Sequence, residues 1–247
     1  MSDSKKEFFR LMSYNIHSCV GTDRHISHRR IAKVIARYSP DFVALQEVDF
    51  MKKRSDKIDQ AKLIAEDLNM EYHYQPSLEG NGEKYGIAFL THFPFEKIKA
   101  EILPGMQHKR RIEPRSAIWI KVDMQNKYLN IISTHLGLRK KERRIQTETL
   151  LGGKWLGRIE GEPVVICGDF NTTPWSKLYK NFADKYPDAQ KNNSGKVSRT
   201  FPSRWPIVRI DHVFISQQIE IEAVSVPRTK LTKKASDHLP IIVDIKL

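Results

Sequence analysis

The chain of 247 residues is 40% hydrophobic and 29% charged, and its formal net charge is +13 at pH 7. No apolar run approaches the roughly 20 residues that a membrane-spanning helix needs, and the polar start MSDSKKEFFR is unlike a signal peptide. The two cysteines, Cys19 and Cys167, exclude a disulfide framework, so we expect a cytoplasmic protein with reduced thiols and no stable membrane association.

Nine short runs rich in β-branched and aromatic residues are typical of β-strands. In chain order these runs are Phe8–Tyr14, Phe42–Gln46, Tyr85–Leu90, Ala117–Val122, Tyr128–Ser133, Val164–Cys167, Ile210–Ile215, Ile219–Val224 and Ile241–Ile245.

Helical patterns separate some of these strands. A helix over Arg29–Tyr38 is predicted because Ser27 is a good N-cap. A second helix is expected to begin at Asp56 or Asp59, a third to cover Lys140–Leu156, and a fourth to have Pro174 in its first turn. Strands joined partly by helices and partly by hairpins predict an α/β (α+β) protein, and the lack of any linker-like stretch predicts one domain over residues 1–247.

Polar residues recur where the apolar strands end. In VVICGDFNTTP, Asp169 and Asn171 lie two residues apart and would point to the same face of an extended strand. Each such residue alone is explained equally well by a turn or a satisfied core position. Binding and catalytic groups, however, tend to follow strands of a rigid sheet, so the repetition indicates a site. The other residues of this kind are Asn15, His17, Glu47, His135, Asp211, Asp237 and His238.

The chemistry of these side chains is complementary. His238 can pair with Asp211, which would favour the charged form of the ring, and Arg115 can hold a phosphate through two parallel hydrogen bonds. Zinc is disfavoured because there is no thiolate cluster, and a serine hydrolase because there is no Gly-x-Ser-x-Gly motif. The hard oxygen donors that suit Mg²⁺ or Mn²⁺ are Asn15, Glu47, Asp169, Asn171 and Asp237.

Six motifs in this order resemble the endonuclease/exonuclease/phosphatase superfamily: LMSYNIH, LQEVD, STHLG, GDFNTTP, RIDHVF and SDHLPI. That group includes deoxyribonucleases, apurinic/apyrimidinic endonucleases, neutral sphingomyelinases and inositol polyphosphate phosphatases. The resemblance extends from about Leu11 to Ile245. It implies a four-layered αββα sandwich of two mixed β-sheets flanked by helices, and metal-dependent hydrolysis of phosphoester bonds.

The resemblance also implies which residues hold the metal. Glu47 resembles the principal ligand of Mg²⁺ or Mn²⁺, with Asn15 beside it and Asp237 as a further metal contact. His17 stands where the apurinic-site branch carries an aspartate, which disfavours a repair enzyme and a second metal ion at that position.

The catalytic roles are likewise carried over from the family. Asp169 resembles the residue that orients or deprotonates the attacking water, and Asn171 resembles an amide donor to the phosphate. His238, paired with Asp211, would contact the scissile phosphate and stabilise charge there. His135 matches the histidine of the deoxyribonuclease-like and sphingomyelinase-like branches.

Three further residues are candidates for contacts around this site. Glu83, in NGEKYGIAFL, is a candidate acidic partner for His135. Phe201 and Trp205, in RTFPSRWPIVRID, lie on the loop that leads into Asp211. They are equally suited to stacking on a base, touching a lipid or fixing the loop in place.

The basic residues form clusters at Lys52–Arg54, Lys109–Arg111, Arg139–Arg144 and Lys230–Lys234. Together with the net charge they favour a nuclease that cuts DNA, or RNA, by in-line attack of water, and a monomer that binds nucleic acid. A phospholipid or sphingomyelin phosphodiesterase is the alternative, because His135 and the YNIH motif also resemble lipid-acting relatives. A non-catalytic nucleic-acid-binding module is the third hypothesis.

Overall fold

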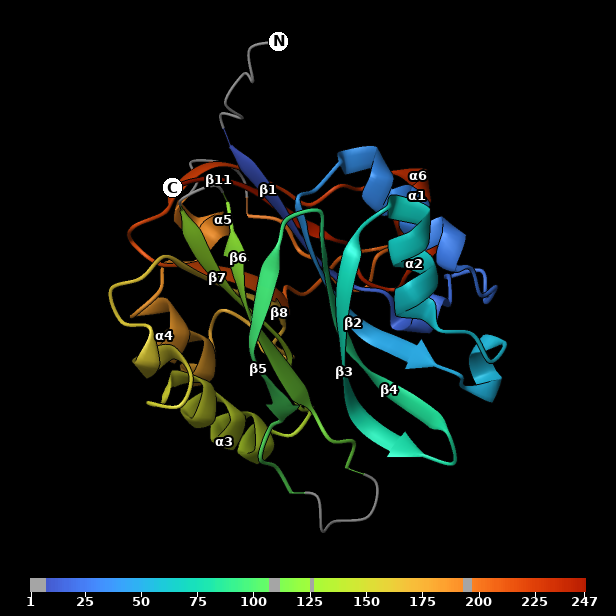
Figure 1. Ribbon diagram of the computed structural model, residues 1–247, viewed down its shortest axis with the longest axis horizontal. Coiled ribbons are helices and arrows are strands. Elements are labelled where there is room, and N and C mark those ends of the chain that lie inside the picture. Colours follow the sequence, from blue (N-terminus) through green and yellow to red (C-terminus); the bar gives the residue numbers. More distant parts are fainter. Residues whose placement is uncertain (1–7, 107–111, 125–126, 193–196) are drawn as a thin grey trace.

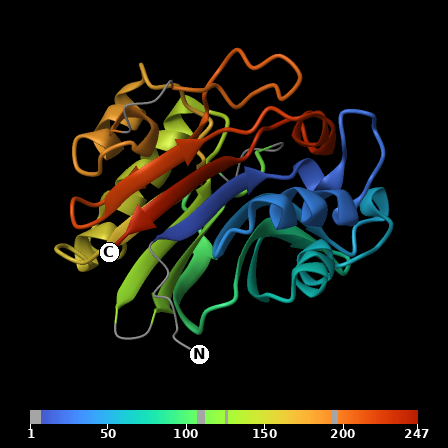
Figure 2. The ribbon, with the colours of Figure 1, turned by 90° about the horizontal axis from the view of Figure 1, so that it is seen from above.

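The computed structural model describes residues 8–106, 112–124, 127–192 and 197–247 (Figure 1). Its strands form two sheets that pack face to face, with helices on the two outer sides (Figure 2). Each sheet contains parallel and antiparallel pairs, so both are mixed. The four-layered sandwich implied by the family resemblance is therefore confirmed.

The first sheet has six strands, and β1 and β2 at its centre run parallel. Across the sheet the order is β10 (Glu220–Ser225), β11 (Ile241–Lys246), β1 (Phe9–Asn15), β2 (Phe42–Phe50), β4 (Glu83–Thr91) and β3 (Glu71–Gly80).

The second sheet has five strands, and β7 and β8 form its parallel pair. Across the sheet the order is β5 (Phe95–Ile102), β6 (Ser116–Asp123), β7 (Tyr128–His135), β8 (Val164–Asp169) and β9 (Asp211–Ile215).

Helices cover the outer faces of both sheets (Figure 1). The first sheet is covered by α1 (His28–Tyr38), α2 (Gln60–Leu68) and α6 (Lys230–Ala235). The second is covered by α3 (Lys140–Leu151) and α4 (Lys177–Ala183), while α5 (Ala189–Asn192) contacts β9 and β10. Three short 3₁₀ turns are η1 (His17–Cys19), η2 (Lys53–Ser55) and η3 (Leu156–Arg158).

Apolar side chains that point alternately to the two faces of each strand form three buried layers, one between the sheets and one under the helices on each outer side. In β2, Phe42 and Ala44 enter the layer between the sheets, whereas Val43 and Leu45 pack under α1 and α2. Successive side chains of a strand point to opposite faces, so a strand buried on both sides reads as a continuous apolar run. This is why the central strands were predictable from the sequence.

All nine predicted strands are present, but β3 and β5 were not predicted. Both are edge strands whose side chains are mostly exposed or half-buried, so their sequences carry little hydrophobic pattern. The third helix ends at Leu151 rather than Leu156, where Gly152 and Gly153 follow. The fourth begins at Lys177 rather than near Pro174, because the Ser176 side chain caps it by accepting from the Tyr179 N–H.

The described part of the chain contains no helix that is both long and apolar enough to span a membrane.

Candidate active site

The register of the second sheet brings three of the polar motifs together. His135 and Asp169 are the last residues of the parallel strands β7 and β8, and they are directly opposite each other. Asp211 begins the antiparallel strand β9 and is opposite Asp169 on the other side. Asn15 ends β1 in the facing sheet, so the polar residues of both sheets meet at one end of the sandwich.

Two backbone features shape this end of the sandwich. Glu47 has a φ of 58° and lies where the β2–β4 register shifts between Gln46 and Val48. Such a bulge re-aims one side chain out of the strand alternation, here toward the cavity that Glu47 lines. Gly168 has a φ of +143°, and a Cβ there would lie 1.9 Å from the Thr134 carbonyl oxygen, so this contact between β7 and β8 requires glycine.

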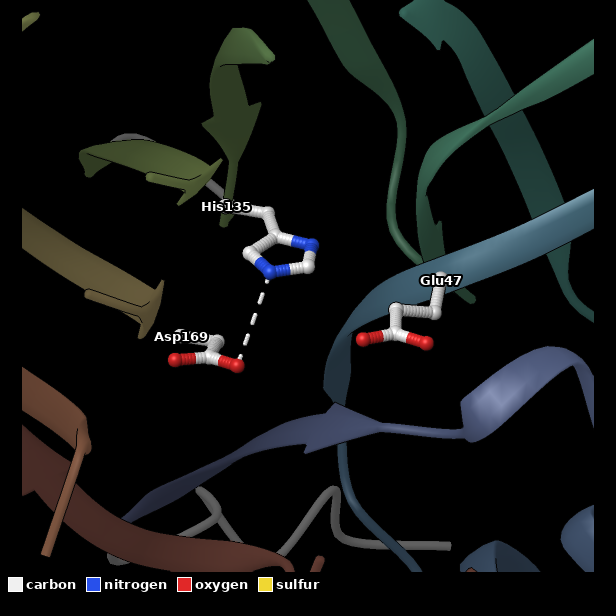
Figure 3. Close-up of side chains that lie close together, drawn as sticks. All are labelled: Glu47, His135 and Asp169. Atoms are coloured by element: carbon white, nitrogen blue, oxygen red, sulfur yellow. Dashed lines mark ion pairs between the residues drawn. The ribbon is translucent and has the colours of Figure 1, made fainter. Parts of the chain in front are cut away.

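Glu47, His135 and Asp169 point into a shared space, although they come from three different strands (Figure 3). One potential ligand atom from each lies within 4.8 Å of the others, and Asp169, Asp211 and His238 form a second such group. Asp169 belongs to both groups and is 2% exposed. The first group offers two carboxylates, so its donor set suits a hard divalent cation.

Asn15 connects the carboxylates of this cluster. Its amide nitrogen donates to Glu47 Oε1 at 2.9 Å and to Asp169 Oδ2 at 3.1 Å, while its amide oxygen accepts from the His17 N–H at 3.0 Å. The amide nitrogen therefore faces the carboxylates here, and the oxygen that we predicted as a metal ligand faces the backbone. Asp237 lines the same cavity but belongs to neither group of closely spaced ligand atoms within the described chain.

Asp169 is the most perturbed carboxyl group of the site. Burial and the neighbouring charge of Asp211 raise its pKa to about 7. Its Oδ1 accepts from the Asn171 N–H at 2.8 Å, which fixes the carboxylate toward the start of the following loop. A carboxyl group with a pKa near neutrality is well matched to accepting a proton from water.

His238 and Asp211 form a close buried pair, as predicted. The ring Nδ1 lies 2.9 Å from Asp211 Oδ2, which also accepts from Thr200 Oγ1 at 2.5 Å. Burial alone would lower the pKa of His238, but the charge and hydrogen bond of Asp211 outweigh it and raise that pKa to about 10. The ring is therefore an imidazolium at neutral pH, and its Nε2 lies 3.8 Å from Asp169 Oδ2.

His135 has the opposite protonation state. Burial and the positive charges of Arg115 and His238 hold the pKa of His135 well below its usual value, so the ring is neutral. Arg115 Nη1 lies 3.3 Å from His135 Nδ1 and can only donate, which makes Nδ1 the acceptor. The ring proton then belongs on Nε2, which lies 3.6 Å from Asp169 Oδ2. The Asn171 amide nitrogen, 3.1 Å from Nε2, can only donate, so it bonds to the Leu136 carbonyl oxygen at 2.9 Å and not to the protonated ring nitrogen.

These side chains surround one cavity of about 580 Å³. Asn15 and Asp211 do not line the cavity, but they contact the lining residues Asp169 and His238. The residues singled out from the sequence that line it are His17, Glu47, Arg115, His135, Asp169, Asn171, Phe201, Asp237 and His238. Arg54, Tyr85 and Glu113 also line the cavity, and this could not be predicted because a basic cluster, a strand tyrosine and a loop glutamate have no motif of their own.

Other sequence predictions have mixed outcomes. Glu83 accepts from the Lys53 N–H, and the ring nitrogens of His135 face Arg115 and Asn171, so the proposed Glu83–His135 pair is wrong. Phe201 packs against the His238 ring with centroids 4.8 Å apart, which fixes the loop, whereas Trp205 is 81% exposed. The basic cluster at 109–111 lies outside the described residues.

Comparison with known proteins agrees with this fold. YbhP, an uncharacterized protein of Escherichia coli (strain K12), is 23% identical, with full coverage of both chains. An endonuclease/exonuclease/phosphatase from Bacteroides vulgatus has a TM-score of 0.80 at 21% identity, covering 98% of this chain and 100% of its own. The mannosyl-6-phosphatase Bt3783 of Bacteroides thetaiotaomicron has a TM-score of 0.78 at 20% identity, covering 97% and 100%. The model of the endonuclease/exonuclease/phosphatase family matches residues 12–238, and the chain belongs to this family.

Proposed function

We propose that this protein is a divalent-metal-dependent phosphodiesterase that cuts a nucleic-acid backbone, with DNA as the first candidate and RNA as the second. Enzymes of its family are hydrolytic phosphoesterases that depend on a divalent metal. The observation that supports the proposal most is one cavity lined by a neutral His135, a protonated His238 and a buried Asp169. Such an arrangement combines a proton acceptor with donors for a phosphate.

Glu47 and Asp169 are the carboxylates that would hold Mg²⁺ or Mn²⁺, with Asp237 and Asn15 close by. A divalent cation bound there supplies positive charge that neutralises the phosphate oxygens.

The chain's own residues account for the remaining chemistry. Asp169 orients a water molecule and accepts its proton as the water oxygen bonds to phosphorus and the bond to the leaving oxygen breaks. His238 Nε2–H and His135 Nε2–H donate to the phosphate oxygens on which negative charge grows. Asp211 keeps His238 charged, and the Asn171 amide adds a further donor at the same edge.

The charge of the protein supports a polyanionic substrate. The net charge is +13, and the basic clusters Lys52–Arg54 and Arg139–Arg144 begin beside the cavity, whose lining includes Arg54 and Leu138. A chain with this charge attracts nucleic acid through its phosphates.

The decisive experiment incubates the purified protein with bis(4-nitrophenyl) phosphate, 4-nitrophenyl phosphate, plasmid DNA, a single-stranded oligonucleotide, RNA and sphingomyelin, each with Mg²⁺, Mn²⁺ or EDTA. We expect cleavage of the diester and of nucleic acid, and no turnover in EDTA. Asp169→Asn should reduce the rate at least about a hundredfold while the circular dichroism spectrum is unchanged. Turnover of the monoester alone, or full activity of Asp169→Asn, would contradict the proposal.

A lipid phosphodiester is the second candidate, and one surface feature favours it. Trp205 and Ile207 are 81% and 65% exposed on the loop that also places Phe201 at the cavity. Exposed apolar side chains beside basic residues suit a membrane interface as well as a nucleobase. Cleavage confined to sphingomyelin would select this candidate.

A further inference from the structure

Three basic side chains gather around Tyr85 on the cavity wall formed by β2 and β4. The guanidinium carbon of Arg54 lies 5.4 Å from the centroid of the Tyr85 ring, and Lys52 Nζ lies 6.0 Å from it. Arg115 Nη1 donates to the Tyr85 hydroxyl at 3.4 Å. Tyr85 itself is 4% exposed, so these contacts form on a fixed ring rather than a mobile one.

Hydrogen bonds along one edge of its guanidinium, formed by Nε and Nη2, hold Arg54 in place. Its Nε and Nη2 each donate to Asp49 at 2.8 Å, and Nη2 also donates to Ser18 Oγ at 3.2 Å. The Asp49 side chain is 0% exposed, whereas that of Arg54 is 55% exposed and lines the cavity. Within the described chain Nη1 has no hydrogen-bond partner, so both of its N–H groups remain available at the cavity.

The carboxylates near this wall are either paired with an arginine or belong to the metal-ligand cluster. Asp49 is buried beneath Arg54, and Glu113 Oε1 accepts from Arg115 at 2.6 Å. Glu47 belongs to the metal-ligand cluster. Among the described residues, no carboxylate forms an ion pair with Lys52. This side of the cavity therefore offers positive charge to a molecule bound in it.

We propose that Arg54, with Lys52 beside it, binds a second phosphate group of the substrate, adjacent to the one that is cleaved. The proposal rests on the proposed function and adds a subsite to it. A guanidinium with one edge anchored and the other free is preorganised for a phosphate oxygen, because little side-chain entropy is lost when the contact forms. On a nucleic-acid strand, the occupant is the neighbouring backbone phosphodiester.

The subsite lies away from the reacting phosphorus, so it should act on substrate affinity and not on the chemical step. The test compares TpT, which has one phosphate, with TpTpT, pTpT and TpTp, which have two. Arg54→Gln should raise KM about tenfold for a two-phosphate substrate, the loss expected for one charge-assisted contact, and leave KM for TpT unchanged. The value of kcat should stay within about twofold for every substrate.

Arg54→Gln leaves Asp49 buried without its partner, which can destabilise the fold. Two further variants therefore test the subsite without leaving this charge unpaired. Asp49→Asn combined with Arg54→Gln removes the buried charge together with the guanidinium, and Lys52→Gln leaves Asp49 untouched. Arg37→Gln is the matched control, since Arg37 is an exposed α1 residue that does not line the cavity.

Turnover of bis(4-nitrophenyl) phosphate by each variant tests the proposed function separately, because this diester has no second phosphate. Loss of affinity for TpTpT supports a backbone diester in the subsite, and loss confined to pTpT or TpTp supports a terminal phosphate there. If the diester is hydrolysed but Arg54→Gln changes KM equally for TpT and its longer relatives, or for none of them, the subsite does not exist.

Discussion

The protonation of His238 depends on its partner Asp211. Asp211 keeps the pKa of this buried ring near 10, although burial alone would lower it below 6.5. Because the pKa in the folded state lies above that in the unfolded state, the pair stabilises the fold fully below pH 6.5. This contribution disappears as the pH rises through about 10.

Asp211→Asn should lower the pKa of His238 by several units, so that the ring is largely neutral at pH 7.5. Nuclear magnetic resonance titration of the His238 Cε1–H in metal-free protein measures this shift directly. Denaturation with urea should show a larger difference between the variant and the wild type at pH 6 than at pH 10. Asp67→Asn, the same change at an exposed position of α2, is the control. A His238 titration that does not move would show that Asp211 is not what keeps the ring charged.

A buried ionic cluster joins the elements that support the catalytic loop. Arg209, just before β9, donates to Asp188 at 3.0 Å and to the Tyr179 hydroxyl of α4 at 3.2 Å. His212 Nε2 lies 2.8 Å from the Thr172 carbonyl oxygen, one residue after Asn171. This cluster therefore ties α4, β9 and the loop that begins at Asp169 into one unit.

The pKa of Asp188 shows that its charge is part of the fold. Burial raises this pKa, but the His212 ring, with Nδ1 3.6 Å from Asp188 Oδ2, and the charge of Arg209 outweigh it, and the result is a pKa of about 2. A depressed carboxyl pKa stabilises the fold above the unfolded value of 3.8, and the stabilisation is lost as the pH falls through about 2.

Arg209→Met should lower the free energy of unfolding at pH 7 by about 3–5 kcal/mol, because it leaves Asp188 as a buried unpaired charge. Combining it with Asp188→Asn should recover a large part of that loss, since both charges are then gone. Urea denaturation of the two variants and the wild type measures the difference. A double variant that is no more stable than Arg209→Met would show that the electrostatic pairing is unimportant.

A helix, strand or site residue can be predicted from the sequence when a short stretch of the chain carries the pattern that identifies it. Central strands such as β2 and β8 are apolar on both faces, and the polar residues at their ends stand out against that pattern. The edge strand β3 has neither feature, because one of its sides faces solvent. The roles of Arg115 and Arg54 depend on contacts with His135 and Asp49 that strand order and loop paths create. Such contacts are not encoded in a short window of sequence.

The charge of the entire chain determines how its affinity for nucleic acid should respond to salt. Lysine and arginine number 42 against 29 aspartates and glutamates. The basic cluster Lys52–Arg54 includes the cavity-lining Arg54, and the cluster Arg139–Arg144 follows the cavity-lining Leu138 in the sequence. Contacts with backbone phosphates release condensed counterions, so affinity falls as a power of the salt concentration.

For about three phosphate contacts, raising KCl from about 50 to about 200 mM should increase KM for duplex DNA about fortyfold, since each contact contributes a slope of about −0.9. The KM for bis(4-nitrophenyl) phosphate should change by less than about twofold, because this singly charged diester binds at the catalytic centre alone and contacts no other basic residues. Steady-state kinetics at constant free Mg²⁺ measure both values. A KM for DNA as insensitive to salt as that of the small diester would mean that the basic surface does not bind the strand, and the positive charge would then need another explanation.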